Sequence, residues 1–283
     1  MARSLGLLIV AALLTGLAAC SPRAEQGSHQ TNEDVQHRTA HREMTDKTDR
    51  TSAPTLPEGR TAGQGTAAVT DASVSWDYVA LGDSLAVGVG AQRGYVSRYA
   101  SYITADTGAR IDLLNLGRSG QTSSQLLYAL RNDPAMRQAL GAAEVITFNI
   151  GINDLGHAGE AYEAGTCGGR DNQKCLRRAV EAFEENWDAI IAEILRSRST
   201  KNTIIRTAGL GYTPHVGEIF KPYVSEVNHH IATTAASHDI PYAQPYLDQR
   251  HMSPDRVHPN DDGYEIIAEQ LRELGYGPLS SPR

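Results

Sequence analysis

Two short patterns, one in the first half of the chain and one near its end, contain residues that can perform nucleophilic chemistry. Gly82-Asp83-Ser84 follows an apolar run, and Asp255 stands three residues before His258. At that spacing a turn allows Asp255 to accept a hydrogen bond from one ring nitrogen of the histidine, which leaves the other nitrogen as a base for a serine hydroxyl. The two patterns together predict acyl transfer, although each alone is also typical of helix caps and turns.

Two further segments contain groups that can donate hydrogen bonds to an oxyanion. Gly120 ends the segment 115–120, and Asn153 lies in the segment 151–154. A glycine allows a backbone N–H to approach a substrate oxygen closely, and an asparagine amide is a neutral donor. Together with the N–H of Ser84 they make three candidate donors. An ordinary turn is the alternative interpretation of each segment.

The elements that must position these residues alternate from Trp76 onward. Short apolar runs, often β-branched, predict strands at residues 77–81, 111–116, 145–150, 203–207 and around 240–243. Helical periodicity predicts helices at residues 95–106, 123–130, 176–196, 223–237 and 263–274. This alternation predicts a mostly parallel sheet with helices on both faces, in which functional groups gather at the carboxyl ends of the strands.

Taken in order, these four blocks resemble the SGNH (GDSL) hydrolase superfamily over residues 77–275. The resemblance implies an α/β fold, a flavodoxin-like three-layer α/β/α sandwich with a five-stranded, mostly parallel sheet. It also implies a serine esterase in which Ser84 is the nucleophile, His258 the base and Asp255 the acid that orients it. Ser84, Gly120 and Asn153 are then expected to form the oxyanion hole.

Four nearby titratable residues are expected to have other roles. Asp83 and Asp154 flank the active residues, and we expect them to stabilise turns rather than take part in catalysis. His157 and His251 are alternative candidates for the base. We expect neither to act, and the acid before His157 already belongs to the segment 151–154.

Cys167 and Cys175 enclose a short glycine-rich segment. In an exported protein a disulfide between them is expected, with a stabilising effect of about 2.5 kcal/mol for so short a ring. A metal site is the alternative, but two cysteines lack the other ligands that zinc requires. We expect residues 155–175 to form a loop on one wall of the substrate cleft.

The beginning of the chain has the pattern of an export signal. Arg3 precedes the apolar run Leu5–Leu17, which leads into Ala18-Ala19-Cys20. This resembles the lipobox of bacterial lipoproteins and predicts a signal peptide at residues 1–19 and lipidation of Cys20. An ordinary signal peptide is the alternative. The apolar run is shorter than the roughly 20 residues of a membrane-spanning helix.

Residues 20–75 are predicted to be a disordered, lipid-anchored tether. They are rich in small polar residues, and all 17 aromatic residues of the chain lie at Trp76 or later. Such a segment cannot offset the entropy of ordering itself, and its span is roughly 40 Å. Its histidines, His29, His37 and His41, are interpreted as solvated linker residues rather than as metal ligands.

The composition of the chain limits the class of partner that it can bind. The 283 residues have a net charge of −7 and no block of Lys or Arg, which argues against a nucleic-acid partner. We therefore expect one hydrolase domain at residues 76–283, acting as a monomer on a small-molecule or lipid ester, outside the cytoplasm, without metal or cofactor. Deacetylation of carbohydrate or acyl transfer in the cell envelope is the alternative, and an inert tethered binding module is a third.

Overall fold

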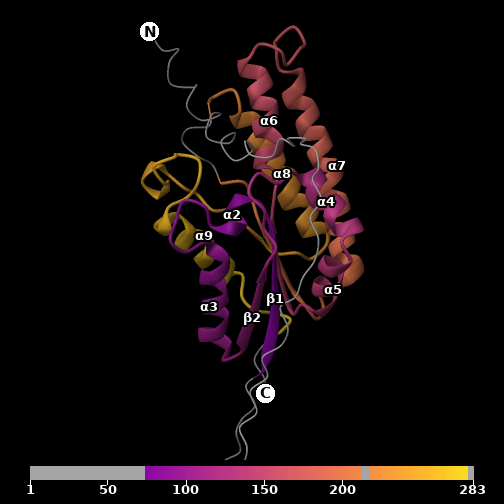
Figure 1. Cartoon of the computed structure of the whole chain (residues 1–283), viewed down its shortest axis with the longest axis vertical. Coiled ribbons are helices and arrows are strands. Elements are labelled where there is room, and N and C mark those ends of the chain that lie inside the picture. Colours follow the sequence, from indigo (N-terminus) through magenta and orange to yellow (C-terminus); the bar gives the residue numbers. More distant parts are fainter. Residues whose placement is uncertain (1–73, 212–216, 280–283) are drawn as a thin grey trace, which may run out of the picture. The chain divides into compact units, whose positions relative to one another are not determined.

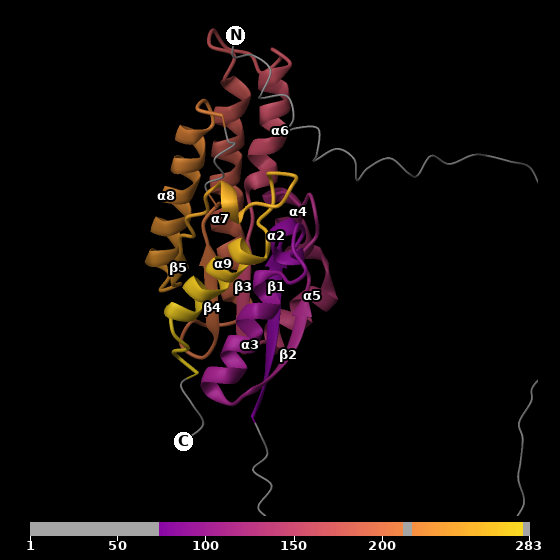
Figure 2. The same cartoon turned by 90° about the vertical axis from the view of Figure 1, so that its left-hand side faces the viewer.

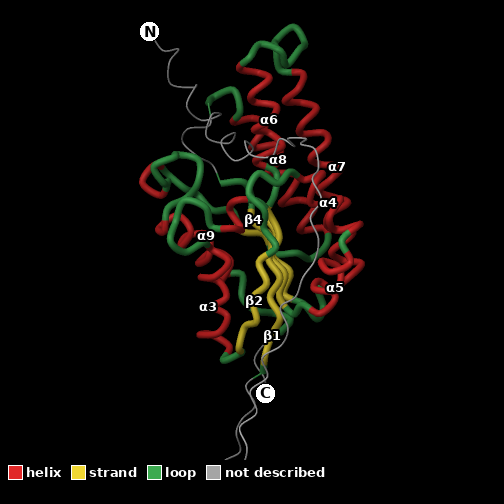
Figure 3. Tube along the Cα trace, in the orientation of Figure 1, coloured by secondary structure: helices red, strands yellow, loops and turns green. Residues whose placement is uncertain are grey.

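The computed structural model describes residues 74–211 and 217–279. Five strands form one sheet in the order β2-β1-β3-β4-β5, and each neighbouring pair is parallel. The strands are drawn in yellow in Figure 3. The strands are β1 (Ser75–Gly82), β2 (Arg110–Asn115), β3 (Val145–Asn149), β4 (Ile204–Ala208) and β5 (Tyr242–Ala243). The predicted signal peptide, Cys20 and the tether up to residue 73 lie outside the described residues.

Eight helices and one 3₁₀ turn occupy the described part of the chain (Figure 1). They are α2 (Ser84–Val87), α3 (Tyr95–Thr107), α4 (Ser123–Asn132), α5 (Pro134–Ala142), α6 (Ile152–Glu163), α7 (Lys174–Ser197), α8 (Lys221–Ser237), η1 (Gln249–His251) and α9 (Asp261–Glu273). None of the helices described here is long and apolar enough to cross a membrane.

The helices cover both faces of the sheet: Figure 1 shows the strands between two layers of helices, and Figure 2 shows the layer of α3 and α9 toward the viewer. Helices α3 and α9 pack on one face, and α4, α5 and α7 lie on the other. Successive residues of β1 enter different cores: Tyr78 and Ala80 pack with α3 and α9, whereas Val79 and Leu81 pack with α4 and α7. This alternation follows from the two-residue period of a strand. The predicted three-layer α/β/α sandwich is confirmed.

Local chemistry explains where the helices that frame the site begin. Thr122 and Gln125 form a reciprocal capping box at the start of α4. Asp133 accepts hydrogen bonds from two N–H groups of α5, which has Pro134 in its first turn. The Asn260 side chain caps α9 through the N–H of Gly263. Each cap fixes the residue at which its helix begins.

The interpretation of residues 155–175 as a loop is wrong for its first half. That stretch continues α6 to Glu163, and a short loop closed by the predicted Cys167–Cys175 disulfide then leads into α7. The buried face of α6 includes Ala158 and Gly159, which carry little apolar surface and therefore give a weak helical pattern. The Phe220 ring packs closely over Gly159.

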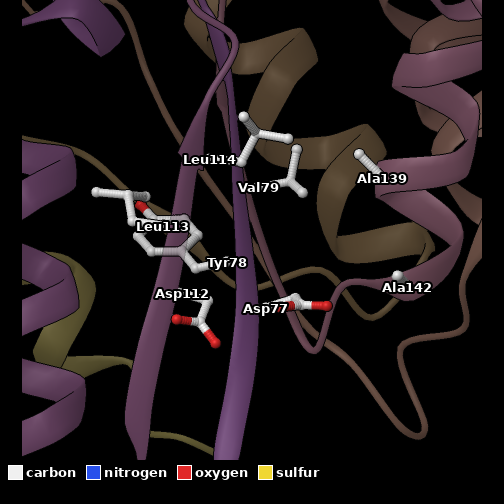
Figure 4. A pocket seen from close by; sticks show the side chains of 8 residues that line it. All are labelled: Asp77, Tyr78, Val79, Asp112, Leu113, Leu114, Ala139 and Ala142. Atoms are coloured by element: carbon white, nitrogen blue, oxygen red, sulfur yellow. The ribbon is translucent and has the colours of Figure 1, made fainter. Parts of the chain in front are cut away.

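A groove of about 350 Å³ lies beside the edge strand β2 (Figure 4). Leu113 and Leu114 are partly exposed there, and Asp77 and Asp112 contribute carboxylates. Its lining contains no serine, cysteine or histidine. The groove therefore provides no nucleophile and base, and the chemistry must be sought at the carboxyl ends of the strands.

Candidate active site

Ser84 lies just beyond the carboxyl end of β1, as the first residue of α2. Gly82 ends the strand with φ +141°, and a Cβ at this position would lie 2.3 Å from Asn149 O of β3. Only glycine allows the two strand ends to come so close. Asp83 then caps α2, because its Oδ1 accepts a hydrogen bond from the N–H of Leu85 at 2.9 Å. Its predicted role in stabilising the turn is consistent with this contact.

The second half of the site is a tight turn before α9. Asp255 Oδ1 accepts hydrogen bonds from Ser253 Oγ (2.6 Å) and from the N–H groups of Val257 (2.8 Å) and His258 (3.0 Å). Arg256 adopts the left-handed conformation, with φ +61°. This uncommon backbone geometry for a non-glycine residue is held in place by the bonds that converge on Asp255.

The two halves meet through one imidazole. His258 Nδ1 lies 2.7 Å from Asp255 Oδ2, and His258 Nε2 lies 2.9 Å from Ser84 Oγ, although 174 residues separate serine and histidine in the sequence. An ionised carboxylate only accepts hydrogen bonds, so the proton belongs on Nδ1. The lone pair of Nε2 then faces the Ser84 hydroxyl, and the three side chains form a directed hydrogen-bonded chain.

The environment keeps Asp255 ionised. Burial favours a higher pKa for this carboxyl, but four hydrogen bonds, led by that from the N–H of His258, hold its pKa well below the usual range. Ser253, the imidazole and the N–H of Val257 supply the other three. A permanent negative charge on the far side of the ring stabilises an imidazolium, which is the species that forms when His258 takes a proton.

The segments that contain Gly120 and Asn153 lie side by side. Asn153 Nδ2 donates to the carbonyl of Gln121 at 2.9 Å, and the Asn153 side chain is buried. Asp154 holds the two segments together from the other side, since its Oδ2 accepts the N–H of Ser123 at 2.9 Å and its Oδ1 lies 2.5 Å from the Ser123 hydroxyl. We expected Asp154 to stabilise its own turn, but its side chain instead joins two segments.

The sheet register brings these segments next to the serine. Gly82 pairs with Asn149 across β1 and β3, so Ser84 follows that pair by two residues and Asn153 by four. Gly120 follows the end of β2, on the other side of β1, with φ +76°. The structure therefore gathers all five predicted site residues at the same end of neighbouring strands.

A small apolar cavity of about 30 Å³ lies beside this group. Leu85, Ile152 and Val257 line it, and each is the chain neighbour of a site residue. The remaining lining residues come from the ends of β3 and β4 and from the segment before α9; they are Asn149, Leu210, Gly211, Leu247, Met252 and Pro259. A single water needs about 10–15 Å³ by this measure, so the space suits only a short apolar chain.

Asp83 is a buried carboxyl directly behind the serine. It has no exposed surface, and its Oδ2 finds no hydrogen-bond partner among the described residues. The pKa of Asp83 is raised to about 7, mainly by burial and to a smaller extent by the nearby carboxylate of Asp154, against the lowering effect of the hydrogen bond from Leu85 N–H. The side chain thus carries little charge in mildly acidic solution.

With this geometry in view, the comparison with known families is decisive. The sequence model of the GDSL-like lipase/acylhydrolase family matches residues 80–266, from within β1 into α9. The chain belongs to this family. Its membership identifies an enzyme that hydrolyses ester bonds.

Two lipases resemble this chain in sequence, and an acetylxylan esterase resembles it in fold. The spore germination lipase LipC of Bacillus licheniformis is 31% identical over 213 residues, covering 71% of this chain and 97% of its own. A lipase from a goat rumen metagenome shares 30% identity with a TM-score of 0.65, covering 72% of this chain and 100% of that chain. An acetylxylan esterase of Geobacillus stearothermophilus, 17% identical with a TM-score of 0.54, covers 72% and 95% and shares the fold.

Two histidines that compete with His258 in the sequence have other partners in this GDSL-like fold. Asp248 precedes His251 by three residues, which is the same spacing as in the Asp255–His258 pair. The spacing of Asp248 and His251 was not considered in the sequence analysis. His251 Nδ1 lies 3.2 Å from the backbone nitrogen of Asp248 and 3.1 Å from its Oδ1, and His251 Nε2 lies 3.2 Å from Arg250 Nε. His157 lies on α6 three residues after Asp154; burial raises the pKa of that carboxyl, and the proximity of His157 only partly opposes this rise.

Sequence reasoning also missed Ser253. Its hydroxyl donates to Asp255 at 2.6 Å, and its N–H donates to the carbonyl of His258 at 2.8 Å, so it closes the turn that presents the imidazole. A serine two residues before an acid is a weak signal for such a turn. Only the folded geometry shows that it supports the turn that holds the His258 imidazole.

Proposed function

We propose that this GDSL-like hydrolase is a serine esterase in which Ser84 is the nucleophile, His258 the general base and Asp255 the residue that orients and charges the imidazole. The observation that supports these roles is the hydrogen-bonded chain from Asp255 Oδ2 through His258 to Ser84 Oγ, with distances of 2.7 and 2.9 Å. A base within 3 Å of a serine hydroxyl and held by a carboxylate is the arrangement that activates a serine.

The reaction then proceeds in two steps. Ser84 Oγ attacks the ester carbonyl while its proton moves to His258 Nε2, and the tetrahedral oxyanion accepts hydrogen bonds from the N–H groups of Ser84 and Gly120 and from the Asn153 amide. His258 returns the proton to the leaving alcohol, which leaves an acyl group on Ser84. His258 next takes a proton from a water molecule, whose oxygen attacks the acyl carbon. The bond from that carbon to Ser84 Oγ then breaks, the acid leaves, and His258 returns the proton to Ser84 Oγ.

A fluorophosphonate probe tests the nucleophile directly. The wild-type enzyme is expected to be labelled on Ser84, and Ser84→Ala is expected to lose both labelling and the hydrolysis of 4-nitrophenyl acetate. Circular dichroism of the variant serves as the control for folding. Turnover by a folded Ser84→Ala protein at the wild-type rate would contradict the proposed nucleophile, and a folded wild-type protein that never reacts would favour an inert binding module.

The small cavity supports short acyl chains as substrates. It is apolar and holds only a few carbons, and we propose that it receives the acyl group. In a series of 4-nitrophenyl esters, kcat/KM is expected to be highest for acetate to butyrate and to fall for octanoate. Leu247→Ala removes three carbons from the lining and is expected to move this preference toward longer chains.

Acetyl esters of carbohydrate, or acyl transfer to a sugar hydroxyl, are the second candidate function. An acetyl group is the smallest acyl chain that the cavity accommodates, so its size favours acetyl donors of either kind. Release of acetate from acetylated xylan, compared with 4-nitrophenyl acetate, tests hydrolysis. Formation of an acetylated sugar from 4-nitrophenyl acetate and a free glycan tests transfer.

We also propose that the enzyme is exported and anchored to a membrane through a lipidated Cys20, facing the extracytoplasmic side. The sequence Leu17-Ala18-Ala19-Cys20 after an apolar run supports this, and two or more acyl chains give stable anchoring where one does not. Cys20→Ser is expected to move the protein from the membrane pellet to the soluble fraction of bacterial cells. Continued pelleting of the variant would argue against acyl anchoring.

A further inference from the structure

The segment that leaves the nucleophile's helix lies directly against the base. The N–H groups of Gly88 and Val89 donate to the carbonyl of Ser84, both at 3.0 Å. At Gly90, φ is +96° and an added Cβ would lie 2.8 Å from His258 Cβ and from Pro259 O. Residues 88–93 therefore form a bridge loop that touches both the serine and the histidine.

The side chain of Asp261 holds this bridge loop. It is the first residue of α9, three positions after His258, and its Oδ2 and Oδ1 accept the N–H groups of Gln92 and Arg93 at 3.1 and 3.2 Å. Oδ1 also pairs with Arg98 Nη2 of α3 at 2.7 Å. The bonds from the Gln92 N–H, the Arg93 N–H and Arg98 outweigh desolvation and lower the pKa of Asp261, so it is a charged acceptor.

Two neighbours strengthen the attachment. The Tyr264 hydroxyl donates to Val89 O at 2.7 Å, and Glu265 pairs with Arg98. The bridge loop is thus tied to α9 at both of its ends, by Tyr264 near the serine and by Asp261 near α3. Because α9 begins three residues after His258, these bonds determine where the serine half of the site lies relative to the imidazole.

We propose that Asp261 is a positioning residue for the hydrolysis: it fixes the bridge loop to α9 and so keeps Ser84 Oγ within hydrogen-bond distance of His258 Nε2. This inference rests on the proposed function of Ser84 and His258. Asp261 touches neither side chain, and it acts only through the backbone of residues 88–93. Small displacements matter here, since a misplacement of about 1 Å can cost about 10²-fold in rate.

Two control positions separate this role from simpler ones. Asp262 is the next residue, in the same turn of α9 and exposed, so Asp262→Ala removes the same charge without touching the bridge loop. Arg272 joins the other end of α9 to α3 through Asp106, at 2.7 and 2.6 Å. Arg272→Ala therefore weakens the packing of the same two helices far from the serine.

The experiment compares Asp261→Ala with these controls in the full chain. We measure kcat and KM for 4-nitrophenyl acetate, the rate of fluorophosphonate labelling and the urea midpoint. Asp261→Ala is expected to lower kcat and the labelling rate by the same factor, about tenfold or more, with KM within twofold. Asp262→Ala and Arg272→Ala are expected to keep kcat within twofold, with a lower urea midpoint for Arg272→Ala. Asp261→Asn retains one acceptor oxygen and is expected to recover part of the rate.

Several results would overturn the proposal. Equal kcat for Asp261→Ala and Asp262→Ala would do so, as would a change confined to KM, or a loss of kcat in Arg272→Ala as large as that in Asp261→Ala. If Asp261→Ala does not fold, the folded Asp261→Asn variant is decisive, and wild-type kcat and labelling for it would refute the role. Undiminished hydrolysis by Ser84→Ala would instead remove the proposed function itself, and the two failures are therefore distinguishable.

Discussion

Asp255 uses its two carboxylate oxygens for different purposes. Oδ1 accepts three hydrogen bonds that shape the turn, from Ser253 and from the N–H groups of Val257 and His258, whereas Oδ2 accepts only the imidazole Nδ1. The same side chain therefore builds the turn and selects the tautomer of the base. A substitution that keeps the hydrogen bonds to Oδ1 but changes the group at Oδ2 tests the selection of the tautomer separately from the turn.

Asp255→Asn is such a substitution. With the amide oxygen in place of Oδ1, the turn persists, but the amide nitrogen faces His258 Nδ1 and favours the tautomer that places the proton on Nε2. In Ser-His-Asp triads this change lowers kcat by about 10⁴-fold, and we expect a loss of about 10³–10⁴-fold here, with little change in KM, in steady-state hydrolysis of 4-nitrophenyl acetate.

The matched control is Ser253→Ala, which removes one bond to Oδ1 and leaves Oδ2 untouched. We expect its kcat to fall by less than about tenfold, because only one hydrogen bond of the turn is lost. If Asp255→Asn retained kcat within tenfold of the wild type, Asp255 would have only its structural part in the turn.

Among the elements, the strands were the most predictable from the sequence. Their buried runs are short and rich in β-branched residues, so each predicted strand lies within about two residues of the observed one. Helix α5 was missed although Asp133 and Pro134 form a typical helix start. Helix α6 was missed for a different reason, because glycine and alanine on its buried face leave no apolar periodicity.

Some residues of the site could be predicted from the sequence, and some of its contacts could not. The three residues of the hydrogen-bonded chain were predicted because local spacing and family resemblance both mark them. The contact between Asp154 and Ser123 joins residues 31 apart, and that between Gln92 and Asp261 joins residues 169 apart. Nothing in the local sequence encodes such pairs, since they arise only when strands β1, β2 and β3 align and α9 packs against α3.

The disulfide allows one element to be tested separately from the chemistry. Cys167 and Cys175 close the turn between α6 and α7, and Cys175 Sγ packs 3.1 Å from Ala158 O. Replacing both by serine is expected to lower the free energy of unfolding by about 2.5 kcal/mol, because the unfolded chain gains the entropy of an open loop. Urea unfolding of the variant, and of the wild type with dithiothreitol, measures this loss.

The two unfolding curves are expected to coincide, and kcat for 4-nitrophenyl acetate is expected to remain within twofold in both samples, because neither cysteine borders Ser84. A free energy of unfolding unaffected by reduction would show that the helix contacts alone hold this turn. A large loss of kcat at unchanged stability would assign the α6–α7 turn a part in the site.

For the whole molecule, the buried carboxyl of Asp83 links stability to pH. Its pKa rises from the ordinary 3.8 to about 7 on folding, mainly through burial. Between these values the folded protein holds a proton on Asp83 that the unfolded chain has released, so the contribution of Asp83 to stability is greatest below about pH 4, falls as the pH rises toward 7 and is level above it. Each pH unit inside that window costs about 1.4 kcal/mol per group.

Asp83→Asn removes this dependence while its amide oxygen still accepts the N–H of Leu85. We measure the free energy of unfolding of both proteins with urea at pH 5 and pH 8. The value for the variant minus that for the wild type is expected to be larger at pH 8 than at pH 5. Asp154, whose pKa burial also raises, is present in both proteins, so the effect of its own burial is common to the two curves. Asp262→Asn, an exposed carboxyl removed from α9, controls for net charge and is expected to run parallel to the wild type. If the Asp83→Asn and wild-type curves also ran parallel from pH 5 to pH 8, Asp83 would be ionised throughout and water would have to reach its unpartnered oxygen.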